Sequence, residues 1–250
     1  MQNKKYSGLL WILSFLPLVL ILLCYTNLPQ QVPLQWGFDG VVRYGEKKEL
    51  LLIGGLSVIM GPMFLYLPRI DPRQENYKRF QRYYELLSLM TMGVLVLVTL
   101  MILSESFWPG RIVVYQAVTI LVSVLFLTLG NLLPKVKNNF FMGVRTPWTL
   151  SDPDVWNRTN RLCGKLFFAA GLYGIPAALL LPEKVLFWSL MTAILAAALI
   201  PCVCSYFWYR QKMEKCRGSE SGYAADITAG KNSETGECSC RDFAAVLNCL

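Results

Sequence analysis

The chain has no histidine among its 250 residues. Histidine is the commonest general base in enzymes and the commonest metal ligand. Its absence excludes histidine-dependent catalytic triads and zinc sites of the His-Glu-x-x-His kind. We therefore expect a protein that is not an enzyme and that holds no metal or other cofactor.

Charged residues are also scarce. They make up 16% of the chain, whereas 54% of the residues are hydrophobic, and soluble domains usually carry about 25% charged residues. Most of the surface is therefore expected to face something other than water. The net charge of +8 does not point to nucleic acid, because the basic residues lie in loops between apolar stretches, where they set membrane orientation.

Six stretches contain no Asp, Glu, Lys or Arg. They are Leu9–Thr26, Leu50–Leu67, Leu86–Leu103, Ile112–Leu133, Leu166–Leu181 and Val185–Tyr209. A membrane span needs about 20 apolar residues, and only helices satisfy such a backbone in lipid. The first stretch also follows two lysines, as a signal peptide would, but Cys24-Tyr25-Thr26 is a poor cleavage site. We predict an all-α integral membrane protein with about six transmembrane helices, the first one retained.

The basic residues predict the orientation of these spans. One side of the membrane would carry 19 of the 24 lysines and arginines, and the other side would carry Arg43, Lys47, Lys48, Arg111 and Lys184. Loops rich in Lys and Arg stay in the cytoplasm. Both chain ends are therefore predicted to be cytoplasmic.

The loop over residues 28–48 would lie outside the cell. Pro29 and Pro33 favour extended backbone before them, and Val32, Leu34 and Trp36 alternate as one face of a strand. Asp39-Gly40 is a tight-turn signal ahead of a returning strand at Val41 and Val42. The sequence thus predicts a small outer hairpin, with Trp36 and Tyr44 suited to the membrane interface.

The loop over residues 130–156 would lie in the cytoplasm. Ser151 is predicted as the N-cap of a helix, with Asp154 completing an approximate capping box. Val155, Trp156, Thr159, Leu162 and Cys163 would form the apolar stripe of this helix, lying along the inner membrane face before the fifth span. Phe140, Phe141 and Trp148 would dip into the headgroups. For Arg145, a lipid phosphate, a helix end and a protein partner all remain open.

The inner loop resembles the signature of a known family. Residues 130–162 contain Gly-Asn-x-Leu-Pro-Lys-Val-Lys, Asn-Phe-Phe-x-Gly-Val-Arg-Thr-Pro-Trp-Thr-Leu and Asp-x-x-Val-Trp-x-x-Thr-Asn-Arg, which is similar to the SdpI family of bacterial immunity membrane proteins. The outer loop resembles the DUF1648-like domain of unknown function that often accompanies it. Gln35 departs from the pattern, because relatives often have histidine there.

The resemblance implies a protein of the bacterial cytoplasmic membrane that protects against a secreted toxin peptide. It also implies that a small transcriptional repressor is captured at the membrane when the toxin is present. The outer residues expected to sense the toxin are Pro33, Gln35, Trp36, Asp39, Gly40, Tyr44 and Lys47. The inner residues expected to signal or to bind a partner are Asn131, Pro134, Lys135, Asn139, Phe141, Gly143, Arg145, Thr146, Pro147, Trp148 and Trp156.

Four segments are expected along the chain. They are residues 1–67 (two helices and the outer loop), 68–129 (helices three and four), 130–209 (the signature loop and helices five and six) and 210–250 (a flexible cytoplasmic tail). Cys238 and Cys240 in this tail are interpreted as reduced thiols, with a soft-metal site as the alternative.

Two other function classes remain as alternatives. A small transporter is conceivable, but the six stretches contain no ionisable residue of the kind that marks ion pathways. An enzyme would need paired carboxylates such as Asp152 and Asp154, for which helix capping is the simpler explanation. An orphan membrane sensor without a cognate toxin also remains open.

Overall fold

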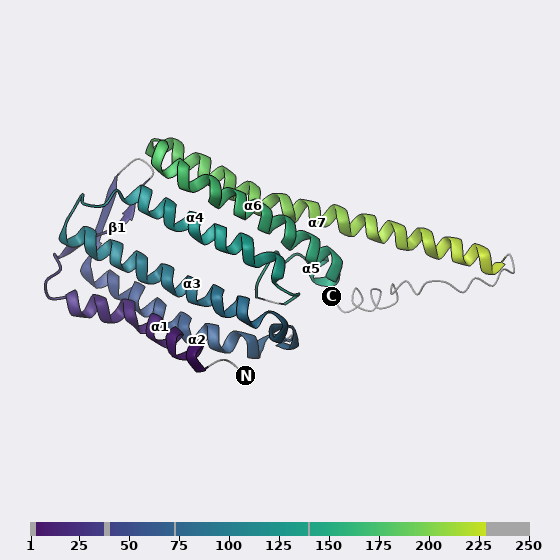
Figure 1. Ribbon diagram of the computed structural model, residues 1–250, viewed down its shortest axis with the longest axis horizontal. Helices are drawn as coiled ribbons and strands as arrows, with labels where there is room; N and C mark the ends of the chain where they lie inside the picture. The colour runs from purple at the N-terminus through teal and green to yellow at the C-terminus, as the bar shows by residue number, and fades with distance from the viewer. Residues whose placement is uncertain (1–3, 38–40, 73, 140, 229–250) are drawn as a thin grey trace.

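The computed structural model of the protein describes residues 4–37, 41–72, 74–139 and 141–228 (Figure 1). Seven α-helices, two strands and two short 3-10 helices make up this part of the chain. In chain order they are α1 (Lys4–Cys24), β1 (Gln31–Trp36), β2 (Val42–Glu46), η1 (Lys47–Glu49), α2 (Leu50–Ile70), α3 (Gln74–Phe107), α4 (Val114–Leu132), η2 (Leu133–Lys135), α5 (Pro147–Ser151), α6 (Pro153–Leu180) and α7 (Glu183–Thr228).

Six of the helices are long and apolar enough to cross a membrane, which confirms the predicted spans. These are α1, α2, α3, α4, α6 and α7. Large apolar side chains lie fully on the outside of this bundle, among them Leu23, Leu52 and Leu180, each more than 70% exposed. A soluble protein rarely exposes apolar surface of this extent. The fold class is therefore an all-α multi-pass membrane protein.

The six spans pack as two groups that lie side by side (Figure 1). Helices α1, α2 and α3 form one group, and α4, α6 and α7 form the other. Inside the first group, Ser14 of α1 and Ser57 of α2 donate hydrogen bonds to each other's backbone carbonyls, both at 2.8 Å. Such reciprocal polar contacts hold membrane helices together where lipid supplies no hydrophobic driving force.

Glycines allow α4 and α6 to approach each other closely. A Cβ atom on Gly130 of α4 would stand 2.5 Å from the backbone nitrogen of Phe168 and 2.7 Å from the carbonyl oxygen of Gly164. Gly171 of α6 meets the α4 backbone in the same way, with the Ser123 carbonyl oxygen 2.6 Å from an added Cβ. This helix pair is therefore packed backbone to backbone within one chain.

The outer loop folds as the predicted hairpin. Strands β1 and β2 pair antiparallel, with Val32 opposite Gly45 and Trp36 opposite Val42. The register shifts between Pro33 and Gln35, which makes Leu34 the extra residue of an irregular β-bulge. The predicted turn at Asp39-Gly40 lies outside the described residues.

The inner helix differs from the prediction in two respects. Its N-cap is Asp152, not Ser151, because Ser151 ends α5 and donates its hydroxyl to the Pro147 carbonyl. Moreover, the predicted stripe from Val155 to Cys163 does not belong to a separate helix on the membrane face. It is the beginning of α6, which runs without a break to Leu180 because no helix-breaking residue separates the two parts.

The C-terminal helix is longer than expected. The sequence placed the end of the sixth span near Tyr209, but α7 continues to Thr228 and so includes the first part of the predicted tail. This part extends beyond the bundle (Figure 1). Cys238 and Cys240 lie outside the described residues.

Candidate functional site

The outer hairpin is seated on the outer ends of α1, α2 and α3. Val32 is fully buried in a cluster with Ile21 of α1, Leu50 of α2 and Ile102 of α3. Leu34 and Trp36, which share the predicted apolar face with Val32, pack partly buried against the same cluster. The alternation of the sequence thus positions the hairpin, since one face of β1 is apolar and is held down by three helices.

The remaining hairpin residues face outward to different degrees. Tyr44 is 55% exposed and Gln35 is also exposed, whereas Pro33 of β1 is buried. Lys47 is half-buried, and its ammonium lies 4.9 Å from the ring centre of Tyr25, as in a cation–π contact. The two residues predicted for the tip, Asp39 and Gly40, lie outside the described residues.

Asn139 folds the first part of the inner loop. It is fully buried, and its side-chain oxygen accepts hydrogen bonds from the N–H groups of Phe141 and Met142, at 2.8 and 2.6 Å. Its side-chain nitrogen donates to the carbonyl oxygens of Lys137 and Met142. One amide side chain thereby satisfies backbone groups that a loop cannot pair with each other.

Gly143 and Asn160 connect this loop to α6. Gly143 has a φ of +104°, a conformation that residues with a side chain rarely adopt, and an added Cβ would stand 2.6 Å from the Asn160 side-chain oxygen. That oxygen accepts a hydrogen bond from the Val144 N–H at 3.0 Å, while the Asn160 nitrogen donates to the Trp156 carbonyl. The glycine in the motif is thus required by a close approach of the loop to the helix.

The short helix α5 ties the loop to α7. Thr146 is its N-cap, and the Thr146 and Thr149 side chains bond reciprocally to each other's backbone. The Trp148 indole N–H donates to the Ser205 hydroxyl, and its ring packs edge-on against Tyr206 at 5.5 Å between ring centres. Trp148 therefore contacts α7, and its predicted contact with lipid headgroups stays a prediction.

A second connection to α7 is ionic. The Asp152 carboxylate is almost fully buried and pairs with Lys212, whose ammonium also lies 2.9 Å from Asp154. Burial alone would raise the pKa of Asp152, but hydrogen bonds from Lys212 and from the N–H groups of Val155 and Asp154 outweigh it. The pKa of Asp152 is therefore lowered, and the carboxylate is held charged.

Trp156 lies where the inner loop meets the other group of helices. It is 1% exposed, and its indole N–H donates to the Val136 carbonyl at 3.1 Å. Around it pack Val136 and Met142 of the loop together with Tyr77, Phe80 and Tyr84 of α3, which we call the inner aromatic cluster. The loop thus contacts α3 on one side and α7 on the other.

The predicted inner residues separate into a buried and an exposed set. Asn139 and Trp156 lie inside the loop structure. Phe141, Gly143, Thr146 and Trp148 are partly covered. The exposed residues are Asn131, Pro134, Lys135, Arg145 and Pro147. Arg145 also interacts with other residues of the chain.

Several residues that organise the site were not predicted. Asn160 belongs to the Thr-Asn-Arg motif, and its position in this motif is the feature of the sequence that could have indicated its role. Asp152 is marked by the Asp-Pro-Asp run, which is typical of a helix start. Lys212 and Ser205 of α7 carry no local signal, because their roles depend on partners more than 50 residues away.

These features define a class: a multi-pass membrane protein of six helices, with one structured loop on each membrane face. Residues 135–205 match the model of the SdpI/YfhL protein family, and residues 12–58 match a domain of unknown function, DUF1648. The immunity protein SdpI of Bacillus subtilis (strain 168) is 24% identical over 213 residues, which are 84% of this chain and 98% of that protein. No solved structure matches the chain.

The comparisons confirm the resemblance to the SdpI family that the inner motif predicted. Together with the six apolar helices, they make the chain a multi-pass protein of the bacterial cell membrane. The two matched models cover both informative loops, except for the first residues of the inner loop. Among the described residues, no group of three or more acidic or cysteine side chains is arranged to hold a metal ion.

Proposed function

We propose that this protein confers immunity against a secreted, membrane-active toxin peptide. The observation that carries the proposal is the extent of the similarity to immunity protein SdpI, which includes 98% of that protein. The two matched models add support, because they cover the outer loop and most of the inner loop. In this proposal, the outer hairpin receives the toxin and the inner loop passes the signal to a small cytosolic repressor.

The proposed receiving surface is the exposed side of the hairpin. On this exposed side of the hairpin, Tyr44 is 55% exposed and Val41 is 64% exposed, although both side chains have large apolar surfaces. Exposed aromatic and apolar side chains of this kind favour binding of an amphipathic peptide. The other side of the hairpin packs on α1, α2 and α3. A displacement of the hairpin by a bound peptide would therefore act on these helices.

Helix α3 supports a route from the outer to the inner face. Its outer end carries Ile102 and Leu103 of the cluster below the hairpin, and its inner end carries Tyr77, Phe80 and Tyr84 of the inner aromatic cluster. At 1.5 Å per residue, the 34 residues of α3 follow a path of about 50 Å, which bends at Phe80 before the inner end. Displacement of this helix by toxin would change the packing around Trp156 and hence the exposed surface of the inner loop.

The test is survival of a susceptible Gram-positive strain that expresses the chain and is challenged with a purified toxin peptide of the SDP type. The native chain is expected to protect. Tyr44→Ala is expected to weaken protection by removing the exposed ring of the hairpin, and Arg145→Ala is expected to abolish it while the protein still reaches the membrane.

Two matched controls make the test specific. Arg158→Ala removes the same charge from an exposed position on the inner part of α6, and Tyr66→Ala removes a ring that is 54% exposed near the inner end of α2. Both controls should protect as well as the native chain. Full protection by the Arg145→Ala strain would refute the role of the inner loop, and no protection by the native chain would favour an orphan sensor.

A further inference from the structure

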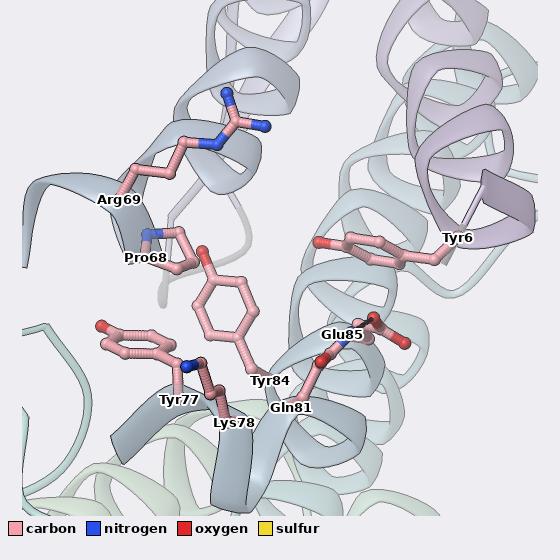
Figure 2. Close-up of a pocket in the computed structure, with 8 residues that line it drawn as sticks. All are labelled: Tyr6, Pro68, Arg69, Tyr77, Lys78, Gln81, Tyr84 and Glu85. Atoms are coloured by element: carbon pink, nitrogen blue, oxygen red, sulfur yellow. Dashed lines mark hydrogen bonds between the residues drawn. The ribbon is translucent and has the colours of Figure 1, made fainter. Parts of the chain in front are cut away.

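A pocket of about 200 Å³ opens between the inner ends of α1, α2 and α3 (Figure 2). Its lining comes from all three helices: Tyr6, Pro68, Arg69, Tyr77, Lys78, Gln81, Tyr84 and Glu85. None of these residues belongs to the hairpin, and only Tyr77 and Tyr84 also contribute to the inner aromatic cluster. The proposed immunity function therefore involves only these two residues of the lining and assigns no role to the pocket itself.

The walls of the pocket are held in place by hydrogen bonds within the protein. The Tyr6 hydroxyl pairs with the Ser88 hydroxyl at 2.8 Å, the Tyr84 hydroxyl donates to the Phe64 carbonyl at 2.6 Å, and the Tyr77 hydroxyl donates to Asp71 at 3.0 Å. Because these hydroxyl groups are bonded to other parts of the protein, the rings of the three tyrosines form apolar walls of the pocket. The pocket is therefore preformed, as most small-ligand sites are.

The charge around the pocket is positive. Arg69 and Lys78 line it, and within the described residues neither forms an ion pair. Two carboxylates are close to these cations: Glu85 of the lining accepts a hydrogen bond from Gln81 at 2.7 Å, and the buried Asp71 behind the wall accepts one from Tyr77 at 3.0 Å. Arg79 and Arg82 line an adjoining open hollow on the same stretch of α3. The surroundings thus favour an anionic group.

The kink of α3 contributes to the shape of this region. Phe80 has non-helical angles, φ −129° and ψ 19°, so that the first turns of α3 bend away from the span. Its side chain is 1% exposed in the inner aromatic cluster, which holds the bend. Lys78 and Gln81 stand on either side of this bend, at the mouth of the pocket.

The pocket lies at the ends of two membrane-spanning helices, where lipid phosphates are expected. Tyr6 is in the first turn of α1, Arg69 is in the last turn of α2, and both belong to the membrane side that carries most of the lysines and arginines. That side is cytoplasmic by the positive-inside rule. Basic pockets between transmembrane helices on this side are known to bind phospholipid headgroups.

We propose that this pocket binds the headgroup of an anionic phospholipid from the inner leaflet. The phosphate is bound by the Lys78 ammonium and by the Arg69 guanidinium, which in the structure lies 5.4 Å from the ring centre of Tyr66 and turns toward the ligand, and the glycerol part lies against the tyrosine rings. The bilayer supplies this ligand, because the pocket opens between helices at the headgroup level and combines apolar walls with a basic rim.

The test is a titration of the detergent-solubilised full chain with phosphatidylglycerol and, separately, with phosphatidylcholine, in which bound lipid is counted by native mass spectrometry. The native chain should prefer phosphatidylglycerol about tenfold. Arg69→Gln/Lys78→Gln should lose that preference, since each basic residue near a membrane surface contributes a several-fold effect. Gln81→Trp, which places an indole in the cavity and keeps both cations, should weaken binding too.

The matched control is Arg158→Gln/Lys165→Gln, which removes one arginine and one lysine from exposed positions on α6 at the same membrane face. This control should bind phosphatidylglycerol within twofold of the native chain. Equal losses in both double variants would overturn the proposal in favour of general surface attraction. Displacement of the lipid by glycerol 3-phosphate, or by a polyglutamate peptide, would overturn it in favour of a soluble anion or an acidic protein partner.

Discussion

Single side chains decide the structure of the inner loop. Asn139 and Asn160 together make six hydrogen bonds, all with backbone groups of the loop or of α6. No regular secondary structure is available to this segment, so amide side chains perform the pairing. The motif is therefore explained in large part by folding of the loop.

The carboxylate of Asp152 makes the stability of the folded protein depend on pH. Its pKa is lowered in the folded protein, whereas an unfolded aspartate titrates near 3.9. The stabilisation is therefore present above about pH 4 and is lost as pH falls through the lower, folded pKa. Lys212 and Asp154 face the carboxylate, and Lys212 stays charged throughout this range.

We expect Asp152→Ala to lower the free energy of unfolding by about 1 kcal/mol at neutral pH, which is typical for loss of an N-cap. The difference from the native protein should shrink below pH 4. Thermal unfolding in detergent between pH 3 and 7 measures both effects. Ser151→Ala serves as the control, because Ser151 is not the cap; an equal loss there would contradict the assignment of Asp152.

At the scale of the elements, the contact between α4 and α6 depends on the absence of side chains. Gly130→Ala would place a Cβ atom against two backbone atoms that cannot move aside, the Phe168 nitrogen and the Gly164 oxygen. Separating two packed helices by overpacking costs about 1–3 kcal/mol. We expect Gly130→Ala to lower the unfolding temperature in detergent.

The matched control is Gly93→Ala in α3, where an added Cβ meets nothing within 4 Å. Alanine is the better helix former, so this variant should be neutral or slightly more stable. If Gly130→Ala and Gly93→Ala have the same unfolding temperature, then α4 and α6 are not in backbone contact.

The whole molecule has an orientation that fusions can test. Six spans place both ends of the bundle on one side, and the distribution of Lys and Arg predicts that this side is cytoplasmic. Alkaline phosphatase fused after Glu49 should be active, because it would follow the outer hairpin, whereas fusion after Arg82 should be inactive. A C-terminal green fluorescent protein should fluoresce. The reverse activities would show that the molecule is inverted.

The inner loop contacts both groups of helices. A movement of one group that starts at the outer face can therefore change the structure of this loop at the inner face. The loop contacts α3 through Trp156 and contacts α7 through Trp148 and Asp152. A change in the distance between the groups must therefore be absorbed by this loop. Signalling through it stays a prediction, and the survival assay with Arg145→Ala addresses it.

The sequence by itself determined the six spans and the outer hairpin. Both follow from local patterns, because a lipid environment demands long apolar helices and a half-buried strand demands alternation. The inner motif also predicted the resemblance to the SdpI family, which the comparisons confirm. The cap of α6, by contrast, was predicted one residue early, because Ser151 and Asp152 are both good N-caps and local rules do not choose between them.

Only the tertiary structure decided what the motif residues contact. Trp148 reaches Ser205, Asp152 reaches Lys212, and Trp156 meets the rings of α3. The pocket of Tyr6, Arg69 and Lys78 likewise combines three helices. Such contacts join residues far apart in the chain, and their distances are set by helix packing, which hydropathy and local periodicity do not encode.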